Sequence, residues 1–137
     1  MINFNRQPKV GFVASCFDLL HAGHCLMLED GKKQCDYLVV GLQTDPTIDR
    51  PDTKNKPILS LEERRILLES NKYVDEIVEY STESELENIL REILPDVRIL
   101  GSDYIGKCAT GSIYSKKIYY HDRNHDYSTT NIRKRLL

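Results

Sequence analysis

The chain has 137 residues, 40% hydrophobic and 29% charged, which is enough for one sizeable core and too little for two ordinary domains, so we expect residues 1–137 to form a single domain. Its 19 basic and 21 acidic residues give a net charge of −2 and no basic field, which argues against a polynucleotide partner. No stretch approaches the roughly 20 apolar residues that span a bilayer, and residues 1–9 lack the apolar region of a signal peptide, so we expect a cytoplasmic protein with no membrane partner.

The first part of the chain predicts a strand, a helix and a second strand. Residues 10–14 form a short apolar run with β-branched side chains, which is typical of a strand buried on both faces of a parallel sheet. Residues 37–43 form a second such run. Between them, residues 24–34 mix apolar and charged side chains at helical spacing. We therefore expect a βαβ unit with a right-handed crossover.

Residues 44–59 predict a long loop, because three prolines stand among charged side chains there. Loops of this length in compact domains are commonly functional lids, although a plain surface connector fits the same composition. The loop is followed by Ser60-Leu-Glu-Glu63, a capping box that predicts a helix to about Asn71.

The second half of the chain continues the alternation of strands and helices. A further capping box, Thr82-Glu-Ser-Glu85, opens a helix that Pro95 ends. The other predicted elements are strands at residues 74–80, 97–100 and 118–120 and a closing helix at residues 128–137. This order predicts an α/β fold, a Rossmann-like open parallel sheet of about five strands with helices on both faces. Ligands of such sheets bind outside the carboxyl ends of the strands.

The turn from Phe17 to His24 follows the first predicted strand and enters a helix, where unpaired backbone N–H groups and the helix dipole attract anions. His21 and His24 are three residues apart, so we expect both on one helical face, and Gly23 lets a ligand approach the backbone. Two imidazoles aimed at one point can donate hydrogen bonds to a phosphate as charge grows in a transition state. Histidines that only cap the start of the helix are the alternative.

The four cysteines contain no Cys-x-x-Cys pair, and a chain of this length needs no disulfides, so we expect reduced thiols. A metal site can be drawn near the turn from Cys16, His21, His24 and Cys25. Their spacing lacks the two-plus-two pattern of structural zinc sites. We therefore expect no metal site built from protein ligands.

Three segments of the chain resemble motifs of a known family. Residues 16–24, Cys-Phe-Asp-Leu-Leu-His-Ala-Gly-His, resemble the His-x-Gly-His signature of the cytidylyltransferases. Residues 72–76 resemble an Arg-Tyr-Val-Asp-Glu segment, with Lys72 in place of arginine, and residues 127–130 resemble an Ile-Ser-Thr-Thr motif. In length and motif order, residues 10–136 are similar to the glycerol-3-phosphate cytidylyltransferase family.

The resemblance implies transfer of CMP from CTP to a small alcohol or polyol phosphate, with glycerol 3-phosphate favoured and pyrophosphate released. It also implies a homodimer. His21 and His24 would stabilise the α-phosphate in the transition state, and Mg²⁺ would accompany the triphosphate, held mainly by phosphate oxygens and water. A phosphate contact is implied for Lys54 or Lys56, and substrate binding for Lys72. The nucleotide-binding residues that the resemblance implies are Ser15, Cys16, Phe17, Asp18, Gly23, Asp103, Tyr104, Arg123, Tyr127, Ser128, Thr129 and Thr130.

Two alternatives to this function fit the same motifs. Related adenylyltransferases, which use ATP on flavin mononucleotide, pantetheine phosphate or a sugar phosphate such as heptose phosphate, share the His-x-Gly-His turn. A catalytically silent nucleotide-binding subunit would keep the cradle without turnover. The chain also departs from the family, with Ser15-Cys16 in place of Gly-Thr or Gly-Ala and Arg-Asn-His-Asp at residues 123–126 in place of Arg-Thr-Glu-Gly. These departures leave the acceptor open.

Overall fold

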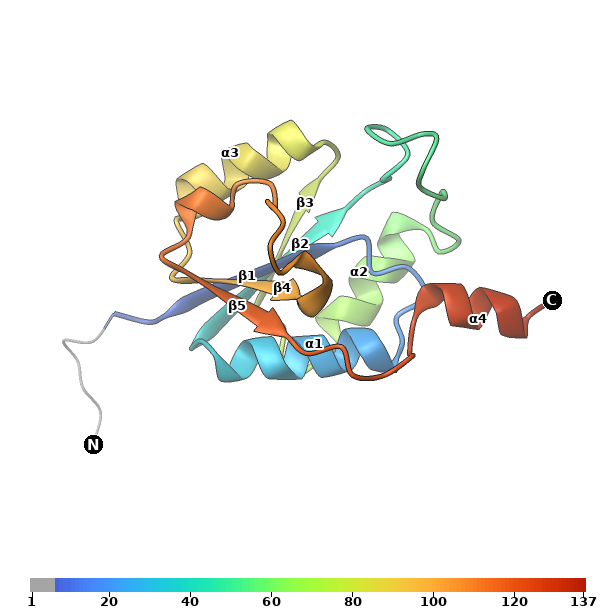
Figure 1. The fold of residues 1–137 in the computed structure, drawn as a ribbon, viewed down its shortest axis with the longest axis horizontal. Helices are drawn as coiled ribbons and strands as arrows, with labels where there is room; N and C mark the ends of the chain where they lie inside the picture. The colour runs from blue at the N-terminus through green and yellow to red at the C-terminus, as the bar shows by residue number, and fades with distance from the viewer. Residues whose placement is uncertain (1–6) are drawn as a thin grey trace.

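The computed structural model describes residues 7–137, so most of the segment examined for a signal peptide lies outside the described residues. Within this range five strands form one sheet, and four α-helices connect or follow them (Figure 1). The elements are β1 (Val10–Ser15), α1 (Ala22–Lys33), β2 (Tyr37–Gln43), α2 (Leu61–Glu69), β3 (Glu76–Tyr80), α3 (Glu83–Ile93), β4 (Val97–Gly101), β5 (Lys117–His121) and α4 (Thr129–Arg135). None of the helices in the described residues is long and apolar enough to cross a membrane.

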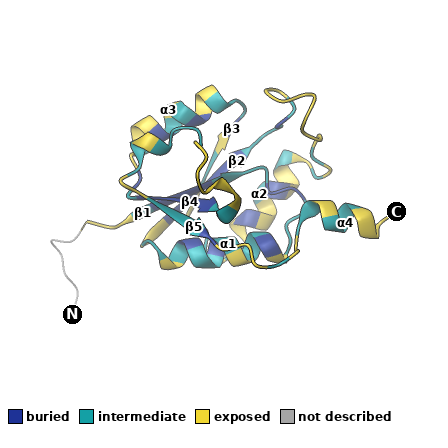
Figure 2. Ribbon diagram, in the orientation of Figure 1, coloured by how far each residue is buried: buried dark blue, intermediate teal, exposed yellow. Residues whose placement is uncertain are grey.

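The sheet is parallel throughout, with strand order β3-β2-β1-β4-β5. On one face Leu28 of α1 and Leu68 of α2 join the core, and on the other face Leu86 and Leu90 of α3 pack with Phe12 (Figure 1). Figure 2 shows the buried residues along the strands and the exposed ones on the outer sides of the helices. The predicted α/β fold with one parallel sheet is confirmed. Its strands are apolar because helices cover both faces of the sheet.

Two elements begin two residues away from their predicted starts. Helix α1 starts at Ala22, because His21 caps its first turn. Strand β3 starts at Glu76, because the Asp75 carboxylate accepts a hydrogen bond of 2.7 Å from the backbone N–H of Leu38 and fixes the turn before the strand. In both cases a side-chain hydrogen bond to the backbone sets the boundary, which hydrophobic periodicity does not report.

The second capping box forms only in part, which corrects the prediction for the start of α3. The Thr82 hydroxyl accepts from the backbone N–H of Glu85 at 3.1 Å, but the Glu85 carboxylate accepts from Ser81 at 2.7 Å instead of from Thr82. Between β4 and β5 the chain also forms two short 3-10 helices, Ser102–Tyr104 and Ser112–Tyr114, for which the sequence shows no periodic signal.

Arg64 of α2 joins three segments at the carboxyl ends of the strands. It is only 2% exposed, and its guanidinium donates to the carbonyls of Cys16, Gln43 and Thr44 at 3.0, 2.6 and 2.7 Å. A further bond of 3.2 Å runs to the carbonyl of Leu59. A buried arginine is tolerated when its donors are paired in this way. Arg64 therefore fixes the turn after β1 against the end of β2 and the start of α2.

Candidate active site

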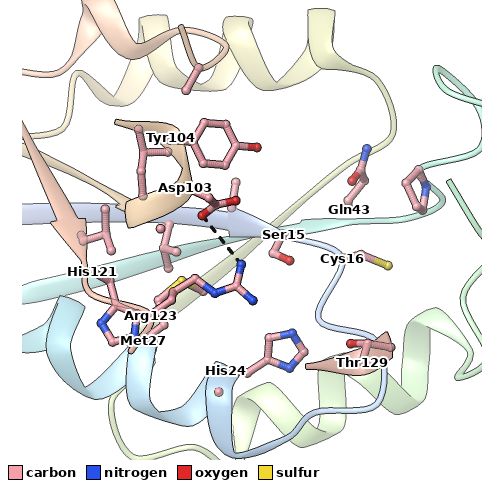
Figure 3. A pocket seen from close by; sticks show the side chains of 18 of the residues that line it. Ser15, Cys16, His24, Met27, Gln43, Asp103, Tyr104, His121, Arg123 and Thr129 are labelled. Carbon is pink, nitrogen blue, oxygen red and sulfur yellow. Dashed lines mark ion pairs between the residues drawn. The ribbon is translucent and has the colours of Figure 1, made fainter. Parts of the chain in front are cut away.

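A cavity of about 470 Å³ opens at the carboxyl ends of β1 and β4, the neighbouring strands where the chain order reverses (Figure 3). Parallel α/β sheets bind ligands at such a reversal. Most predicted site residues line it, namely Ser15, Cys16, His21, Gly23, His24, Lys54, Asp103, Tyr104, Arg123, Tyr127, Ser128, Thr129 and Thr130. Phe17 and Asp18 line a smaller hollow beside it, whereas Lys56 and Lys72 line neither.

The two histidines of the turn share the capping of α1. The Nδ1 atom of His21, the N-cap residue, accepts from the backbone N–H groups of Gly23 and His24 at 3.0 and 3.4 Å. In return, the Nδ1 atom of His24 accepts from the backbone N–H of His21 at 3.3 Å. The rings stack with centroids 3.7 Å apart. His21 thus precedes the helix, which corrects the expectation that both histidines lie on one helical face.

These hydrogen bonds fix the tautomers of the two imidazoles. When Nδ1 accepts from the backbone, a neutral imidazole carries its proton on Nε2, which then acts as a donor. Burial lowers the pKa of His24 to about 3, helped by the neighbouring His21 and Arg123. Burial and Arg123 also lower the pKa of His21. Capping and phosphate binding are therefore compatible, because each uses a different ring nitrogen.

The low pKa of His24 predicts that acid weakens the fold. In the unfolded chain the imidazole takes up a proton near its usual pKa of about 6.5, whereas in the folded protein it stays neutral down to about 3, so the unfolded state binds the extra proton between these values. Stability is full above the unfolded pKa and falls with pH below it, by about 2 kcal/mol at pH 5. Urea unfolding at pH 5 and pH 7 should show this loss, and His24→Asn should lose less. An equal pH dependence in both proteins would contradict the assigned pKa.

Gly23 lines the cavity and is also closely packed against the segment after β5, so the approach of a ligand to its backbone stays a prediction. A Cβ at this position would lie 2.8 Å from the carbonyl oxygen of Tyr127 and 3.1 Å from the ring of His125. The glycine thus lets the segment after β5 pack closely on the first turn of α1. This contact places the residues before α4 at the cavity.

Asp18 closes the turn as a structural clamp. It is 7% exposed, and its carboxylate accepts from the backbone N–H groups of Ile58 and Leu59 at 2.8 and 2.9 Å. It also lies 3.4 Å from the guanidinium of Arg133 in α4. Phe17, 1% exposed with a φ of 52°, packs beside His24. Both residues therefore shape the turn, and the carboxylate ties the end of the 44–59 loop to it.

Replacing the Asp18 carboxylate should loosen the 44–59 loop. In Asp18→Asn an amide NH₂ faces a backbone N–H, so one buried donor loses its acceptor, at a cost of about 1–3 kcal/mol of unfolding free energy. Limited proteolysis should cut this loop faster than in the wild type. Asp52→Asn, an exposed change within the same loop, is the matched control and should leave the cleavage rate unchanged. Equal cleavage of both variants would show that the clamp does not hold the loop.

The start of α4 supplies hydroxyl groups to the cavity. Ser128 caps the helix by accepting from the backbone N–H of Asn131 at 3.0 Å, which leaves its own O–H free to donate. Thr129 donates to the backbone carbonyl of Asp18 at 3.3 Å. Thr130 also lines the cavity. Hydroxyls beside unpaired N–H groups at a helix start suit the binding of phosphate.

Arg123 brings a positive charge to the cavity near His24 (Figure 3). Its guanidinium lies between Asp103 and His24 in this view and 3.7 Å from the Asp103 carboxylate. Tyr104 and Tyr127 are partly exposed at the cavity edge. The predicted neighbours of the base, ribose and phosphates are thus gathered in one cavity, although their individual roles stay predictions.

The predicted basic residues divide by position. Lys54 lines the cavity, whereas Lys56 does not. Hydrogen bonds from Thr47 lower the pKa of Asp45, and the charge of Lys56 adds to this effect. Lys72 precedes β3 at the amino-end edge of the sheet, and its ammonium lies 5.1 Å from the centroid of the Tyr73 ring. The structure therefore does not bring Lys72 to the cavity. The homodimer stays a prediction.

The sequence analysis missed several side chains that line the cavity. His121, at the end of β5, is 7% exposed, and its Nδ1 atom lies 2.8 Å from the Asp30 carboxylate. Among the described residues neither its Nε2 atom nor that of His125 has a hydrogen-bond partner. Arg98 of β4 is a third such residue. His121 and His125 follow a predicted strand, and Arg98 interrupts one. A charged residue within an apolar strand was the signal that could have identified Arg98.

The described residues contain neither a disulfide nor a cluster of metal-ligating side chains. All four cysteines are free, as expected for reduced thiols. Within residues 7–137 no group of three or more histidine, cysteine, aspartate or glutamate side chains could hold a metal ion. Asp18 and Asp103, the acidic residues predicted near the nucleotide, are engaged by backbone N–H groups and by Arg123.

The fold and the cavity together define an α/β domain of the nucleotidyltransferase type, with a strand, a histidine-bearing turn and a helix at the reversal of the sheet. The chain belongs to the cytidylyltransferase-like family, whose model matches residues 12–135. The predicted nucleotidyltransferase class is therefore confirmed at the level of the family. The choice of CTP and of glycerol 3-phosphate is not.

Among characterised relatives, the chain is 34% identical over 132 residues to the bifunctional protein HldE of Helicobacter pylori strain HPAG1. It is 38% identical over 130 residues to the protein of the same name from Campylobacter concisus strain 13826. These matches cover 96% and 95% of the chain but 28% and 27% of the relatives. The chain thus spans little more than a quarter of their length.

Solved structures share the fold. The lipopolysaccharide core biosynthesis protein from Thermoplasma volcanium GSS1 has a TM-score of 0.64 and 26% identity, over 89% of this chain and 100% of that one. Pantothenate synthetase from Thermus thermophilus has a TM-score of 0.66 at 14% identity, over 90% of this chain and 61% of that one. The second likeness concerns the fold alone.

Proposed function

We propose that this protein transfers AMP from ATP to a sugar phosphate, releasing pyrophosphate and forming an ADP-sugar. The observation that carries the transfer reaction is the stacked pair His21 and His24, whose Nδ1 atoms are held by backbone N–H groups. Their Nε2–H groups are thereby left as neutral donors at a cavity that also holds Arg123 and the start of α4. This arrangement suits a phosphate that gains charge during reaction.

The names of the relatives support a sugar acceptor. The solved structure at 26% identity is a lipopolysaccharide core biosynthesis protein, and a lipopolysaccharide core is built from sugars. Within the resemblance described above, the members that act on sugar phosphates use ATP, so the acceptor and the nucleotide are proposed together. The cavity also offers polar side chains beyond the phosphate cradle, including Gln43, Glu83 and Tyr80, which suit an acceptor rich in hydroxyl groups.

In the proposed reaction an oxygen of the acceptor phosphate attacks the α-phosphorus of ATP. A phosphorus–oxygen bond forms there while the bond from the α-phosphorus to the bridging oxygen breaks, and pyrophosphate leaves with that electron pair. A phosphomonoester is already an anion near neutral pH, so no strong base is required. His21 and His24 donate to the α-phosphate oxygens, and Ser128 and Lys54 bind the phosphates that leave.

Magnesium fits the site only as a companion of the triphosphate. The carboxylates near the turn are already engaged, and Mg²⁺ retains water and binds phosphate oxygens readily. When bound, the ion neutralises the charge that develops on pyrophosphate. The chain's own residues would orient the triphosphate around it through Arg123 and the hydroxyls at the start of α4.

Transfer of CMP from CTP to glycerol 3-phosphate is the second candidate. The similarity of residues 10–136 to that family in length and motif order favours it. The same cradle would serve, because the histidines and the start of α4 bind phosphates rather than the base. A silent nucleotide-binding subunit is the third candidate, and the intact His21, His24 and Ser128 argue against it.

The acceptor is tested by incubating the protein with either ATP or CTP, Mg²⁺ and single phosphorylated compounds and measuring the release of pyrophosphate. The panel holds a heptose 1-phosphate, hexose 1-phosphates and glycerol 3-phosphate. We expect a sugar phosphate to exceed glycerol 3-phosphate by about tenfold or more in kcat/KM, because unmatched polar groups of the site penalise the wrong acceptor. Faster turnover with glycerol 3-phosphate would contradict the sugar assignment, and no turnover with any acceptor under ATP or CTP would favour the silent subunit.

A further inference from the structure

Arg98 is a buried cation without a counter-ion. It lies on β4 and is 3% exposed, with its guanidinium 5.6 Å from the centroid of the Phe12 ring. Within residues 7–137 the Arg98 side chain makes one hydrogen bond, 2.8 Å from Nη1 to the carbonyl of Thr110. Its Nε atom is buried with no partner, and Arg98 forms no ion pair within the same range. This side chain therefore keeps donors that the protein does not use.

Arg98 lines the part of the cavity nearest α3, which we call the Arg98 lobe. The lobe is bounded by Tyr80 at the end of β3, Glu83 at the start of α3, and Tyr104 and Thr110 between β4 and β5. The histidine pair and the start of α4, which form the phosphate cradle, come from other elements. The two ends of the cavity are thus lined by residues from different elements.

The acidic residue of the lobe forms its ion pair with another arginine. The Glu83 carboxylate lies 3.5 Å from the guanidinium of Arg50 in the 44–59 loop, and no ion pair joins it to Arg98. Burial lowers the pKa of Arg98, and Tyr80, Tyr104 and Glu83 oppose this shift only in part. A buried, poorly compensated charge is unfavourable unless a ligand supplies the missing partner.

A purely structural role for Arg98 would not explain why most of its guanidinium N–H groups have no acceptor. Arg64, the other deeply buried arginine, donates through Nε, Nη1 and Nη2 to four backbone carbonyls and is satisfied by the fold. Arg98 holds one carbonyl of the loop before β5 with one atom. The contrast between the two arginines indicates that Arg98 is kept for a partner outside the chain.

We propose that Arg98 binds the phosphate group of the acceptor in this lobe. The inference rests on the proposed function, because it assigns the second substrate of the same reaction to this end of the cavity. The planar guanidinium can donate two parallel hydrogen bonds to phosphate oxygens. Burial raises the pKa of the Tyr80 phenol, so its hydroxyl keeps its proton and can donate beside Arg98. The two substrates are thus held by separate residues on either side of the bond that forms.

The test uses inorganic phosphate as the probe and the full chain saturated with the α,β-methylene analogue of whichever nucleotide the turnover assay selects. Phosphate is titrated by calorimetry into the wild type, Arg98→Met and Arg98→Lys. We expect Arg98→Met to weaken phosphate binding about tenfold or more and Arg98→Lys to retain part of it. Affinity for the nucleotide analogue should change less than about threefold in all three proteins. Arg91→Met is the matched control, because Arg91 also touches the loop before β5, through Tyr114, but lies outside the cavity lining.

A second measurement covers the case in which Arg98→Met does not fold. In the ¹⁵N-labelled wild type, the Nε–H resonance assigned to Arg98 should shift with added phosphate and report the same dissociation constant as calorimetry. Unchanged phosphate affinity in Arg98→Met, or an unmoved Arg98 resonance, overturns the proposal. If Arg98→Met weakens binding of the nucleotide analogue as much as binding of phosphate, the proposal is overturned as well. If the enzyme uses CTP instead of ATP, the proposed function changes. The phosphate titration still tests the role of Arg98, because it is then done with the CTP analogue.

Discussion

Replacing His24 with alanine should lower turnover by about 100-fold or more, because the variant loses one preorganised donor to the α-phosphate. His21→Ala should show a similar loss together with a weaker α1, since His21 is also the N-cap. These two effects can be separated. Asparagine is a good N-cap but carries no Nε2–H, so His21→Asn should keep a stability close to the wild type and still lose the rate, whereas His21→Ala loses about 1 kcal/mol as well.

The matched rescue for the other histidine is His24→Gln, whose terminal amide can place an N–H near the position of Nε2. It should recover part of the rate that His24→Ala loses. Initial rates of pyrophosphate release at saturating substrate, beside thermal unfolding curves, give both readouts. Near-full rates in His24→Ala and His21→Asn would show that the stacked pair is only a helix cap.

Arg64→Met should lower the unfolding free energy by about 3 kcal/mol or more. Methionine keeps much of the length and apolar stem but leaves the buried carbonyls of Cys16, Gln43 and Thr44 without their donors. Since those carbonyls belong to the turn after β1 and to the end of β2, nucleotide affinity should fall as well. Urea unfolding and binding of the triphosphate analogue measure the two effects.

The neighbouring Arg65→Met is the control for this change. Its guanidinium is partly exposed and pairs with Glu69 and Glu79 on the surface, so its loss should change stability by less than about 1 kcal/mol. Equal stability of both variants would mean that the hydrogen bonds of Arg64 do not hold the strand ends together.

The order of strands and helices was predictable because each element repeats one simple period. Residues 38–42 are apolar and buried, as in a strand covered on both faces, and Ser60 and Glu63 form the reciprocal cap that their spacing predicts. Boundaries were less predictable. The start of α1 depends on His21 acting as a cap, a role that histidine rarely takes.

The turn with His21 and His24 could be predicted because its residues are local in the sequence, and the resemblance supplied Asp103, Arg123 and residues 127–130. His121 and Arg98 were missed, since their places at the cavity depend on pairings between distant residues. Asp30 meets His121 across 91 positions, and Arg98 lies beneath a loop held by Thr110. Arg64 gave a weak signal, because it stands on the apolar face of α2 one turn before Leu68, where a hydrophobic residue is expected.

The transfer of AMP rather than CMP is tested most directly by competition. The protein is given equal concentrations of ATP and CTP with Mg²⁺ and the best sugar phosphate from the acceptor panel, and the nucleotide-linked products are separated and weighed by mass spectrometry. The account predicts that the ADP-sugar exceeds the CDP-sugar by about tenfold or more, a difference of about 1.4 kcal/mol between the transition states. A predominantly cytidylylated product would contradict it.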